Sequence, residues 1–129
     1  MHYLDTSAAV KLVVVEKGTT ALRRWLRSRD DRIVSSDLLR TELLRVTRGA
    51  APDQVVQARA VLDSLILVAM STSVFERAAM LEPEVLRSLD ALHLAAALEL
   101  GDDLEGMVTY DDRLASGANV LGIRVVAPI

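Results

Sequence analysis

The sequence predicts an α/β fold in which a mostly parallel sheet of about five strands is buried between helices. Two observations support this prediction. Short apolar runs with the composition of β-strands alternate along the chain with longer segments of helical composition. Each short run is apolar at successive positions and is followed by a polar capping signal, as is typical of parallel strands covered on both faces.

Five strands are expected from these apolar runs. The first is "HYL", which ends directly at "DTS", and the second is "RIVSS". The third, fourth and fifth are "LILVAM", "GMVTY" and "IRVVA". In chain order, the expected strands cover residues 2–4, 32–36, 65–70, 106–110 and 123–127.

Helical segments separate the strands. The expected helices cover residues 7–15, 19–29, 37–48, 53–63, 73–82, 89–100 and 111–116. No internal repeat, linker or low-complexity tract interrupts this alternation, and 129 residues suffice for one ordinary hydrophobic core. We therefore expect a single domain over residues 1–129.

Composition excludes several classes of site. The chain has no cysteine, which excludes a disulfide framework and a thiolate zinc site and fits a reducing cytoplasm. No apolar run reaches the length of a membrane span, and the first residues lack the pattern of a signal peptide. Apolar residues make up 51% of the chain, so part of the apolar surface is expected to face a partner.

The charge distribution leaves nucleic acid open as a partner. The net charge of −3 argues against it, because nucleic-acid-binding proteins usually carry an excess of Lys and Arg. Arginines nevertheless cluster in "RRWLRSRDDR" and at Arg40, Arg45 and Arg48. A weakly acidic protein can thus carry a basic face beside an acidic pocket.

Three carboxylates are expected at the carboxyl edge of the sheet, where parallel α/β proteins bind their ligands. Asp5 directly follows the first expected strand, and Asp111 directly follows the fourth. Asp90 opens the helix that leads into the fourth strand and is interpreted as the N-cap of that helix. Helix capping alone would also explain each of these acids.

Glu42 is the most informative acid. It lies one turn into the helix that follows the second strand, where Leu38, Leu39 and Val46 share its face. A carboxylate within an apolar stripe must be paired, protonated or bound to a metal, because burying a lone charge is costly. The simpler alternative is a surface ion pair with Arg45.

Four acids directed at one edge predict a bound cation, because like charges held close together destabilise the fold. Mg²⁺ or Mn²⁺ is expected, since these hard ions accept a few carboxylates together with waters. Zinc is poorly supported, because His2 and His93 are the only histidines in the chain. His93 is interpreted as a packed or hydrogen-bonded helix residue rather than a ligand.

Four segments resemble the sequence blocks of PIN-domain ribonucleases, and most closely those of VapC toxins from bacterial toxin–antitoxin pairs. They are "LDTSAAVKL", "SSDLLRTELLR", "LRSLDALHLAAALEL" and "VTYDDRLA". The resemblance covers essentially the whole chain, and "LDALHLAAA" together with "TYDDRL" is its specific part. It implies a three-layer α/β/α PIN-like domain, usually a homodimer, that cleaves RNA with Mg²⁺ and is inhibited by a cognate VapB-type antitoxin.

The resemblance also implies roles for individual residues. Asp5, Glu42, Asp90 and Asp111 match the acidic quartet of the family, and Asp5 and Asp90 match its principal metal ligands. We expect metal-activated water to attack the scissile phosphate in line and to leave a 5′-phosphate and a 3′-hydroxyl. Glu42 or Asp111 is expected to orient that water rather than bind metal directly.

Several further residues are expected to support this chemistry. Thr109 matches a hydroxyl residue that supports the site in the family, and Asp112 adjoins Asp111 so closely that the sequence does not separate the two. Trp25 is expected to pack in the core or under a partner rather than stack on RNA. Substrate phosphates are expected to be steered by Arg40, Arg45, Arg87 and Arg113, each of which could equally be a solvated surface charge.

Three alternative functions were compared with the motifs that each of them requires. A phosphoacceptor signalling domain needs an aspartate at the end of the third strand, and "LILVAMSTS" has none. A nucleotide-binding module needs a glycine-rich phosphate loop, and neither G-x-G-x-x-G nor G-K-[ST] occurs. A catalytically silent PIN-like scaffold that binds RNA or protein stays open, because intact acids do not prove turnover.

Overall fold

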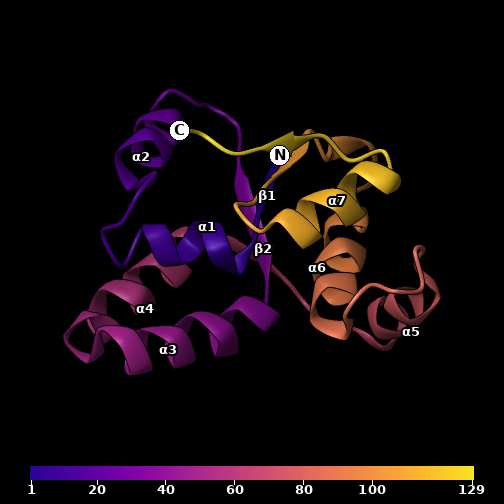
Figure 1. Cartoon of the computed structure of the whole chain (residues 1–129), viewed down its shortest axis with the longest axis horizontal. Helices are drawn as coiled ribbons and strands as arrows, with labels where there is room; N and C mark the ends of the chain where they lie inside the picture. The colour runs from indigo at the N-terminus through magenta and orange to yellow at the C-terminus, as the bar shows by residue number, and fades with distance from the viewer.

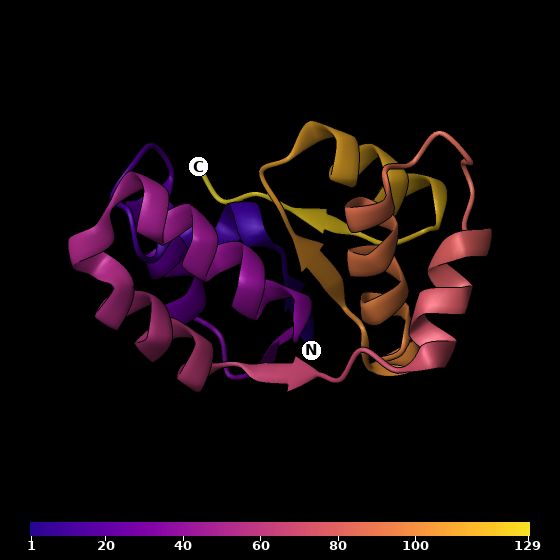
Figure 2. The same cartoon turned by 90° about the horizontal axis from the view of Figure 1, so that it is seen from below.

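The computed structural model describes residues 1–129 and contains one five-stranded sheet with helices packed on both faces (Figures 1 and 2). The spatial order is β3-β2-β1-β4-β5, and all neighbouring strands run parallel. The strands are β1 (His2–Leu4), β2 (Ile33–Ser36), β3 (Ile66–Val68), β4 (Gly106–Val108) and β5 (Val125–Val126). The predicted α/β/α architecture with a central parallel sheet is confirmed.

Seven α-helices connect and cover the strands. They are α1 (Thr6–Lys11), α2 (Thr19–Arg27), α3 (Leu38–Ala50), α4 (Val55–Ser64), α5 (Thr72–Met80), α6 (Ser88–Leu98) and α7 (Asp112–Val120). Two short 3-10 turns, Pro52–Gln54 and Gly101–Asp103, precede α4 and β4. The element order matches the prediction, although α1 ends four residues earlier than expected and α7 continues four residues further.

Alternation along the central strands divides the core into two layers, because successive side chains of a strand point to opposite faces. Tyr3 of β1 and Met107 of β4 belong to the cluster formed with α5, α6 and α7. Leu4 and Val108, the next residues along, belong to the cluster formed with α1, α3 and α4. Both clusters consist mainly of Leu, Val and Ala, as expected for a chain with few aromatic residues.

The edge strands depart from the prediction that every strand is covered on both faces. Ile66 at the start of β3 is 45% exposed, and the other residues of β3 and both residues of β5 are only half-buried. These strands lie at the two ends of the strand order, so each has a neighbour on one side only. Their apolar composition therefore reflects partial rather than complete burial.

Register places the carboxyl ends of β1 and β4 side by side at the middle of the sheet. Leu4 pairs with Val108, so Asp5 and Thr109 are the first residues beyond the paired strands. The backbone N–H of Asp5 donates to the carbonyl of Val108 at 3.2 Å, which continues this alignment past the end of β1. The two residues thus begin the loops that lead into α1 and α7 from the same edge.

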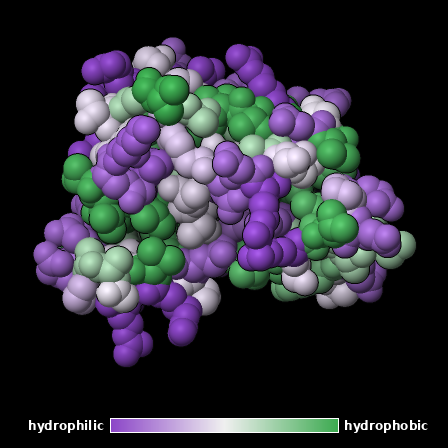
Figure 3. Space-filling view, in the orientation of Figure 1, coloured by the Kyte–Doolittle hydropathy of each residue, from purple (hydrophilic) through white to green (hydrophobic).

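Large apolar side chains are exposed on several elements, and four of them lie on α5, on the segment that follows it and at the start of α6. Phe75 and Leu89 are each about half exposed, and Met80 and Val85 are more than 80% exposed. On the face shown in Figure 3, hydrophobic and hydrophilic side chains are otherwise interspersed. None of the helices has the combination of length and hydropathy needed to cross a membrane.

Candidate active site at the carboxyl edge of the sheet

Asp5 is a buried carboxylate at the end of β1, with only 3% of its surface exposed. It is the N-cap of α1 and accepts a hydrogen bond of 3.0 Å from the backbone N–H of Ala8. The hydroxyl groups of Ser7 and Thr109 also donate to it, at 2.7 Å and 2.6 Å. Burial raises the pKa of Asp5, and the hydrogen bonds from Thr109, Ala8 and Ser7 act in the opposite direction.

Ser7 and Thr109 tie Asp5 to the loop that precedes α7. The Ser7 hydroxyl accepts from the backbone N–H of Tyr110 at 2.9 Å, and Thr109 Oγ1 accepts from the backbone N–H of Asp111 at 3.1 Å. The predicted support of the site by Thr109 therefore has a specific geometry. The role of Ser7 was not predicted, because spacing along one chain does not reveal a contact across more than a hundred residues.

Glu42 lies on α3 and faces α6 across the edge of the sheet. Its Oε1 is 2.6 Å from Nε2 of His93 and accepts a hydrogen bond of 2.8 Å from Thr6 Oγ1. Burial acts to raise the pKa of Glu42, but the hydrogen bond and charge of His93, followed by the Thr6 hydroxyl, lower it. Of the three states that its position allowed, Glu42 is a paired carboxylate, and its partners are His93 and Thr6 rather than Arg45.

The apolar stripe predicted around Glu42 is narrower than expected. Leu39 and Leu43 are fully buried, whereas Val46 is 41% exposed. The Glu42 side chain itself is 22% exposed. Glu42 thus lies at the border between the core and the open edge, because the buried face of α3 is centred on Leu39, Leu43 and Thr47.

A buried hydrogen-bond chain continues from His93 into the core. Nδ1 of His93 is 2.8 Å from the hydroxyl of Tyr3, which donates to Ser36 Oγ at 2.9 Å. His93 and Tyr3 are 3% and 0% exposed. The imidazole ring is thus held at both nitrogens, with Tyr3 on the core side and Glu42 on the open side. The interpretation of His93 as a hydrogen-bonded helix residue is confirmed, but its connection to Glu42 was not predicted.

The prediction that Asp90 is the N-cap of its helix is wrong. The N-cap of α6 is Arg87, which has an extended backbone and makes no side-chain capping hydrogen bond. Asp90 is the third residue of α6, because the helix begins at Ser88 rather than after Asp90. Burial and then the negative charge of Asp111 raise the pKa of Asp90.

Asp111 is the N-cap of α7. Its Oδ1 accepts from the backbone N–H groups of Arg113 and Leu114, at 2.9 Å and 3.3 Å. Asp112 is the first residue of the helix and is exposed. The two adjacent aspartates therefore differ in position. Asp111 borders the cavity that Glu42 and Asp90 line, and Asp112 does not.

Three of the four predicted site acids line one cavity of about 350 Å³, which we call the acidic cavity. Its lining consists of Glu42, Arg87, Ser88, Leu89, Asp90, Asp111 and Arg113. Asp5 is not part of this lining, but Thr6 connects its loop to Glu42 and Thr109 connects it to Asp111. The acids thus converge on one region from α3, α6 and the ends of β1 and β4.

Two of the four arginines predicted to steer phosphate border this region, and two do not. Arg87 and Arg113 line the acidic cavity. Arg40 instead forms an ion pair with Asp37 at 2.9 Å, and Arg45 is exposed outside the cavity lining. Trp25 is half-buried against the cluster formed with α1, α3 and α4, at an edge-to-face distance of 5.0 Å from His2.

The donor chemistry of the acidic cavity suits a hard divalent cation. Its acidic residues offer carboxylate oxygens, and burial together with the negative charge of Asp111 raises the pKa of Asp90. No three of the four acids bring their oxygens within 4.8 Å of one another, a spacing met only by His2, Asp31 and Glu105. A hexacoordinate ion such as Mg²⁺ accommodates this wider spacing, because it retains several of its waters.

The group formed by His2, Asp31 and Glu105 lies at the opposite edge of the sheet, beside the amino ends of β1, β2 and β4. Its spacing would admit a metal ion, and this group was not predicted from the sequence. Arg29 already contacts Asp31 at 2.6 Å, and the N-terminal amine lies 3.7 Å from Glu105. These cations compensate the carboxylates, and the hydrogen bond from His2 together with Arg29 keeps the pKa of Asp31 low despite its burial.

Comparison with known proteins identifies the family of this chain. The sequence model of the PIN domain family matches residues 2–119. Ribonuclease VapC46 of Mycobacterium tuberculosis (strain ATCC 25618 / H37Rv) is 45% identical over 126 residues, which cover 98% of this chain and 96% of the relative. Ribonuclease VapC47 of the same species (strain CDC 1551 / Oshkosh) is 42% identical over 132 residues, which cover 99% and 97%.

Solved structures share the fold at lower sequence identity. The crystal structure of M. tuberculosis VapC20, described as a sarcin–ricin loop cleaving toxin, aligns with a TM-score of 0.79 and 15% identity over 99% of this chain and 100% of that one. A toxin–antitoxin complex from Klebsiella pneumoniae aligns with a TM-score of 0.75 and 21% identity, over 100% and 98% of the two chains.

Proposed function

Because this chain belongs to the PIN-domain family, among its VapC-type ribonucleases, we propose that it is the endoribonuclease toxin of a VapBC-type toxin–antitoxin pair. One observation carries the proposal beyond family membership. Glu42, Asp90 and Asp111 line a single cavity, with the buried Asp5 tied to it through Thr109. Acids from separate parts of the chain would not be held together at this edge by helix capping alone.

Asp5 and Asp90 are the residues proposed to hold Mg²⁺, with Mn²⁺ as a substitute. Both carboxylates have raised pKa values, so a divalent cation beside them would relieve an unfavourable concentration of negative charge. Bound Mg²⁺ would lower the pKa of a coordinated water and neutralise charge on the scissile phosphate. Ser7 and Thr109 orient Asp5 by donating to its oxygens, and these hydrogen bonds oppose the rise in its pKa that burial causes.

Glu42 is proposed to orient the attacking water. The 2.6 Å contact with His93 and the hydroxyl of Thr6 fix Glu42 Oε1, which leaves Oε2 available to the cavity. Asp111 uses Oδ1 to cap α7 and can present Oδ2 to the same water or to its metal. Arg87 and Arg113 supply positive charge for the substrate phosphates on the cavity rim.

The proposed partners are an RNA substrate, a cognate VapB-type antitoxin and a second copy of the chain, and the proposed compartment is the cytoplasm. The family relationship supports the antitoxin, and the Klebsiella pneumoniae structure similar to this chain is itself a toxin–antitoxin complex. The exposed apolar side chains around α5 support a protein interface, because large apolar residues are otherwise costly on a surface.

Cleavage of total cellular RNA by the purified protein, free of antitoxin, tests this function. We expect discrete fragments with Mg²⁺ and none with EDTA. The matched variants are Asp111→Asn and Asp112→Asn, which remove one charge from adjacent positions; asparagine also preserves the cap at position 111. Asp111→Asn should reduce cleavage at least about 10²-fold, and Asp112→Asn should leave it nearly unchanged.

Asp90→Asn provides a second variant at the site, because Asp90 does not cap its helix and the change removes charge rather than a structural hydrogen bond. Cleavage that persists equally in EDTA or in Asp90→Asn would show that a contaminant or another site cuts the RNA. Absence of cleavage by folded wild-type protein would favour a scaffold that binds RNA or protein without turnover.

A further inference from the structure

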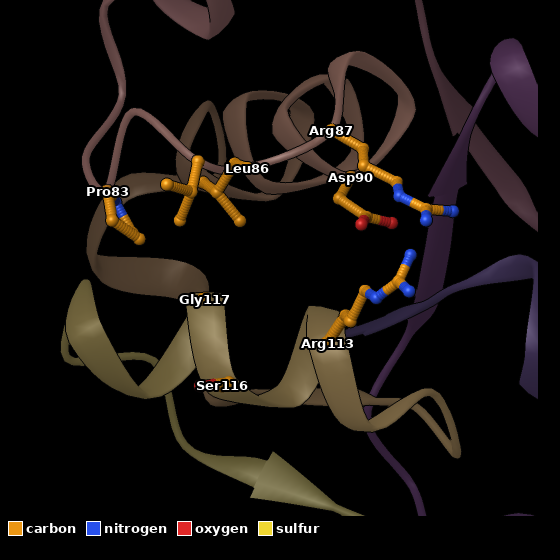
Figure 4. A pocket seen from close by; sticks show the side chains of 8 residues that line it. Pro83, Leu86, Arg87, Asp90, Arg113, Ser116 and Gly117 are labelled. Atoms are coloured by element: carbon orange, nitrogen blue, oxygen red, sulfur yellow. The ribbon is translucent and has the colours of Figure 1, made fainter.

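The acidic cavity borders a second cavity at Asp90. This second cavity also has a volume of about 350 Å³, and it shares Arg87, Asp90 and Arg113 with the acidic cavity. Its remaining lining consists of Pro83, Val85, Leu86, Ser116 and Gly117, and we call it the apolar recess. The shared residues form the boundary between a charged compartment and a largely apolar one (Figure 4).

Close packing between Leu86 and α7 shapes the recess. A Cβ atom on Gly117 would lie 2.7 Å from Leu86 Cδ2 and 3.1 Å from Leu94 Cδ1. The absence of a side chain at Gly117 therefore lets Leu86 lie directly against the helix backbone. The resulting wall is apolar, and Asp90 at the boundary is the only carboxylate in the lining.

Two guanidinium groups converge at the boundary. Arg87 extends from the start of α6 and Arg113 from the first turn of α7, and both point past the Asp90 carboxylate toward one another (Figure 4). Ion pairs with carboxylates occupy Arg29, Arg40 and Arg77 but neither of these two. The Asp90 carboxylate lies beside both guanidinium groups and compensates one of their two positive charges (Figure 4). A bound phosphate would compensate the second, because it suits the fork of donors on each guanidinium.

We propose that the apolar recess binds the base of the nucleotide adjacent to the scissile phosphate, while Arg87 and Arg113 bind the phosphate that links this nucleotide to the cleavage site. Single-stranded RNA is recognised by splaying bases out of the strand and stacking them on apolar side chains and guanidinium planes. The recess offers both surfaces within one cavity, and its volume lies in the range of small-ligand sites, about 300–1,000 Å³.

This inference rests on the proposed nuclease function, because it gives that site a means of selecting nucleotides. The phosphate contacts would contribute affinity for any RNA, and the recess would distinguish one base from another. Arg113 is accordingly a substrate-binding residue, whereas Ser116, which lines the recess on the exposed side of α7, contacts only the base.

Binding of small nucleotides tests the recess without requiring cleavage. The wild-type chain is titrated with each of the four nucleoside 5′-monophosphates and with ribose 5-phosphate, in Mg²⁺, by isothermal calorimetry or chemical-shift titration. At least one nucleotide should bind about tenfold more tightly than ribose 5-phosphate, because only the nucleotide carries a base to stack in the recess.

Two pairs of variants assign this difference to the structure. Ser116→Leu narrows the recess and should reduce nucleotide affinity to that of ribose 5-phosphate, whereas Ser116→Ala should retain the tenfold difference. Arg113→Gln should weaken both ligands to a similar extent, and Arg59→Gln, on the exposed surface of α4, should weaken neither. Ser116 and Arg113 are exposed, so the folded state should tolerate these changes.

Equal affinity for the nucleotides and ribose 5-phosphate would overturn the proposal, and so would an unchanged difference in Ser116→Leu. Either result would mean that the recess receives something other than a base, such as a side chain of a protein partner. If the wild-type protein cleaves RNA but binds the nucleotides no more tightly than ribose 5-phosphate, only the proposed base site is wrong. Protein that discriminates bases but never cleaves RNA would overturn the nuclease function and leave the base site standing.

Discussion

His93 Nε2 lies 2.6 Å from Glu42 Oε1, and this contact joins α6 to α3 beside the carboxyl ends of the strands. The opposite nitrogen of the same ring is held at 2.8 Å by Tyr3, which is fully buried. A residue of the core thereby determines the orientation of a carboxylate at the open edge.

Two different substitutions of His93 should each preserve one of its two hydrogen bonds and remove the other. The side-chain amide nitrogen of His93→Gln can occupy the place of Nε2 and keep the bond to Glu42, whereas that of His93→Asn replaces Nδ1 and keeps only the bond to Tyr3. We expect His93→Asn to lower kcat about 10²-fold with little change in KM, because misplacement of about 1 Å has this effect. His93→Gln should retain kcat within about tenfold of wild type.

Steady-state kinetics on the mapped RNA target distinguishes the two variants, with thermal unfolding as a control for folding. Equal losses of kcat in both variants would show that His93 contributes to stability rather than to the orientation of Glu42.

Asp90→Asn should have opposite effects on stability with and without metal. Its folded-state pKa is raised, so the ionised form favours unfolding and the stability contributed by Asp90 falls as pH rises through that pKa. At pH 7 without metal, the variant should therefore melt about 1–4 °C above wild type. Millimolar Mg²⁺ should raise the Tm of wild type more than that of the variant, because bound metal stabilises the folded state.

Differential scanning fluorimetry with EDTA and with Mg²⁺ measures both effects, and Asp112→Asn is the control of equal charge. A lower Tm for metal-free Asp90→Asn would mean that the carboxylate stabilises the fold through a contact, contrary to the repulsion from Asp111.

Thr109→Val should shift the pH dependence of cleavage. The Thr109 hydroxyl donates to Asp5 at 2.6 Å and lowers a pKa that burial has raised. Its loss should raise that pKa further, so the acidic limb of kcat/KM should move to higher pH. Thr109→Ser keeps the hydroxyl and should retain the wild-type profile. An unchanged acidic limb in the valine variant would show that Asp5 does not control this ionisation.

Asp31→Asn should affect stability without affecting catalysis. The hydrogen bond from His2 and the contact with Arg29 lower the pKa of Asp31, so its ionised form stabilises the fold. This contribution is complete above the unfolded-state pKa of about 3.9 and decreases as pH falls below it. We expect a loss of about 1 kcal/mol at pH 7, moderated by solvent at the partly exposed carboxylate.

Urea unfolding at pH 7 and at pH 3 measures this loss, which should be smaller at the lower pH. The kcat of Asp31→Asn in Mg²⁺ should equal that of wild type. A large decrease in activity would instead point to a functional metal at His2, Asp31 and Glu105.

Much of the fold was predictable because its signals are local. The strand β1 and the cap at Asp5 follow from an apolar triplet that ends at "DTS", and α7 follows from Asp111 in the same way. Predictions were wrong where the same local residue pattern is compatible with two structures. Asp90 has the composition of a cap, but the extended backbone of Arg87 begins the helix three residues earlier.

Edge position and cross-chain contacts were not predictable from local signals. The apolar run of β3 resembles that of a central strand, and only the order of strands shows that one of its sides lacks a neighbour. The partners of Glu42 and Asp5 lie 51 and 104 residues away in the chain. The recess depends on the fit of Leu86 against Gly117, which no spacing within the sequence expresses.

The order of the elements, the parallel sheet and the presence of acids at strand ends are properties of the chain, because hydrophobic period and capping chemistry act over a few residues. Which acids share a cavity, which are paired and which nitrogen of His93 faces Glu42 are properties of the packed molecule. They arise when β1 and β4 align at Leu4 and Val108 and α6 packs against both the sheet and α7. Hydrogen bonds and charge repulsion act over a few ångströms of space, and folding alone brings such distant residues within that range.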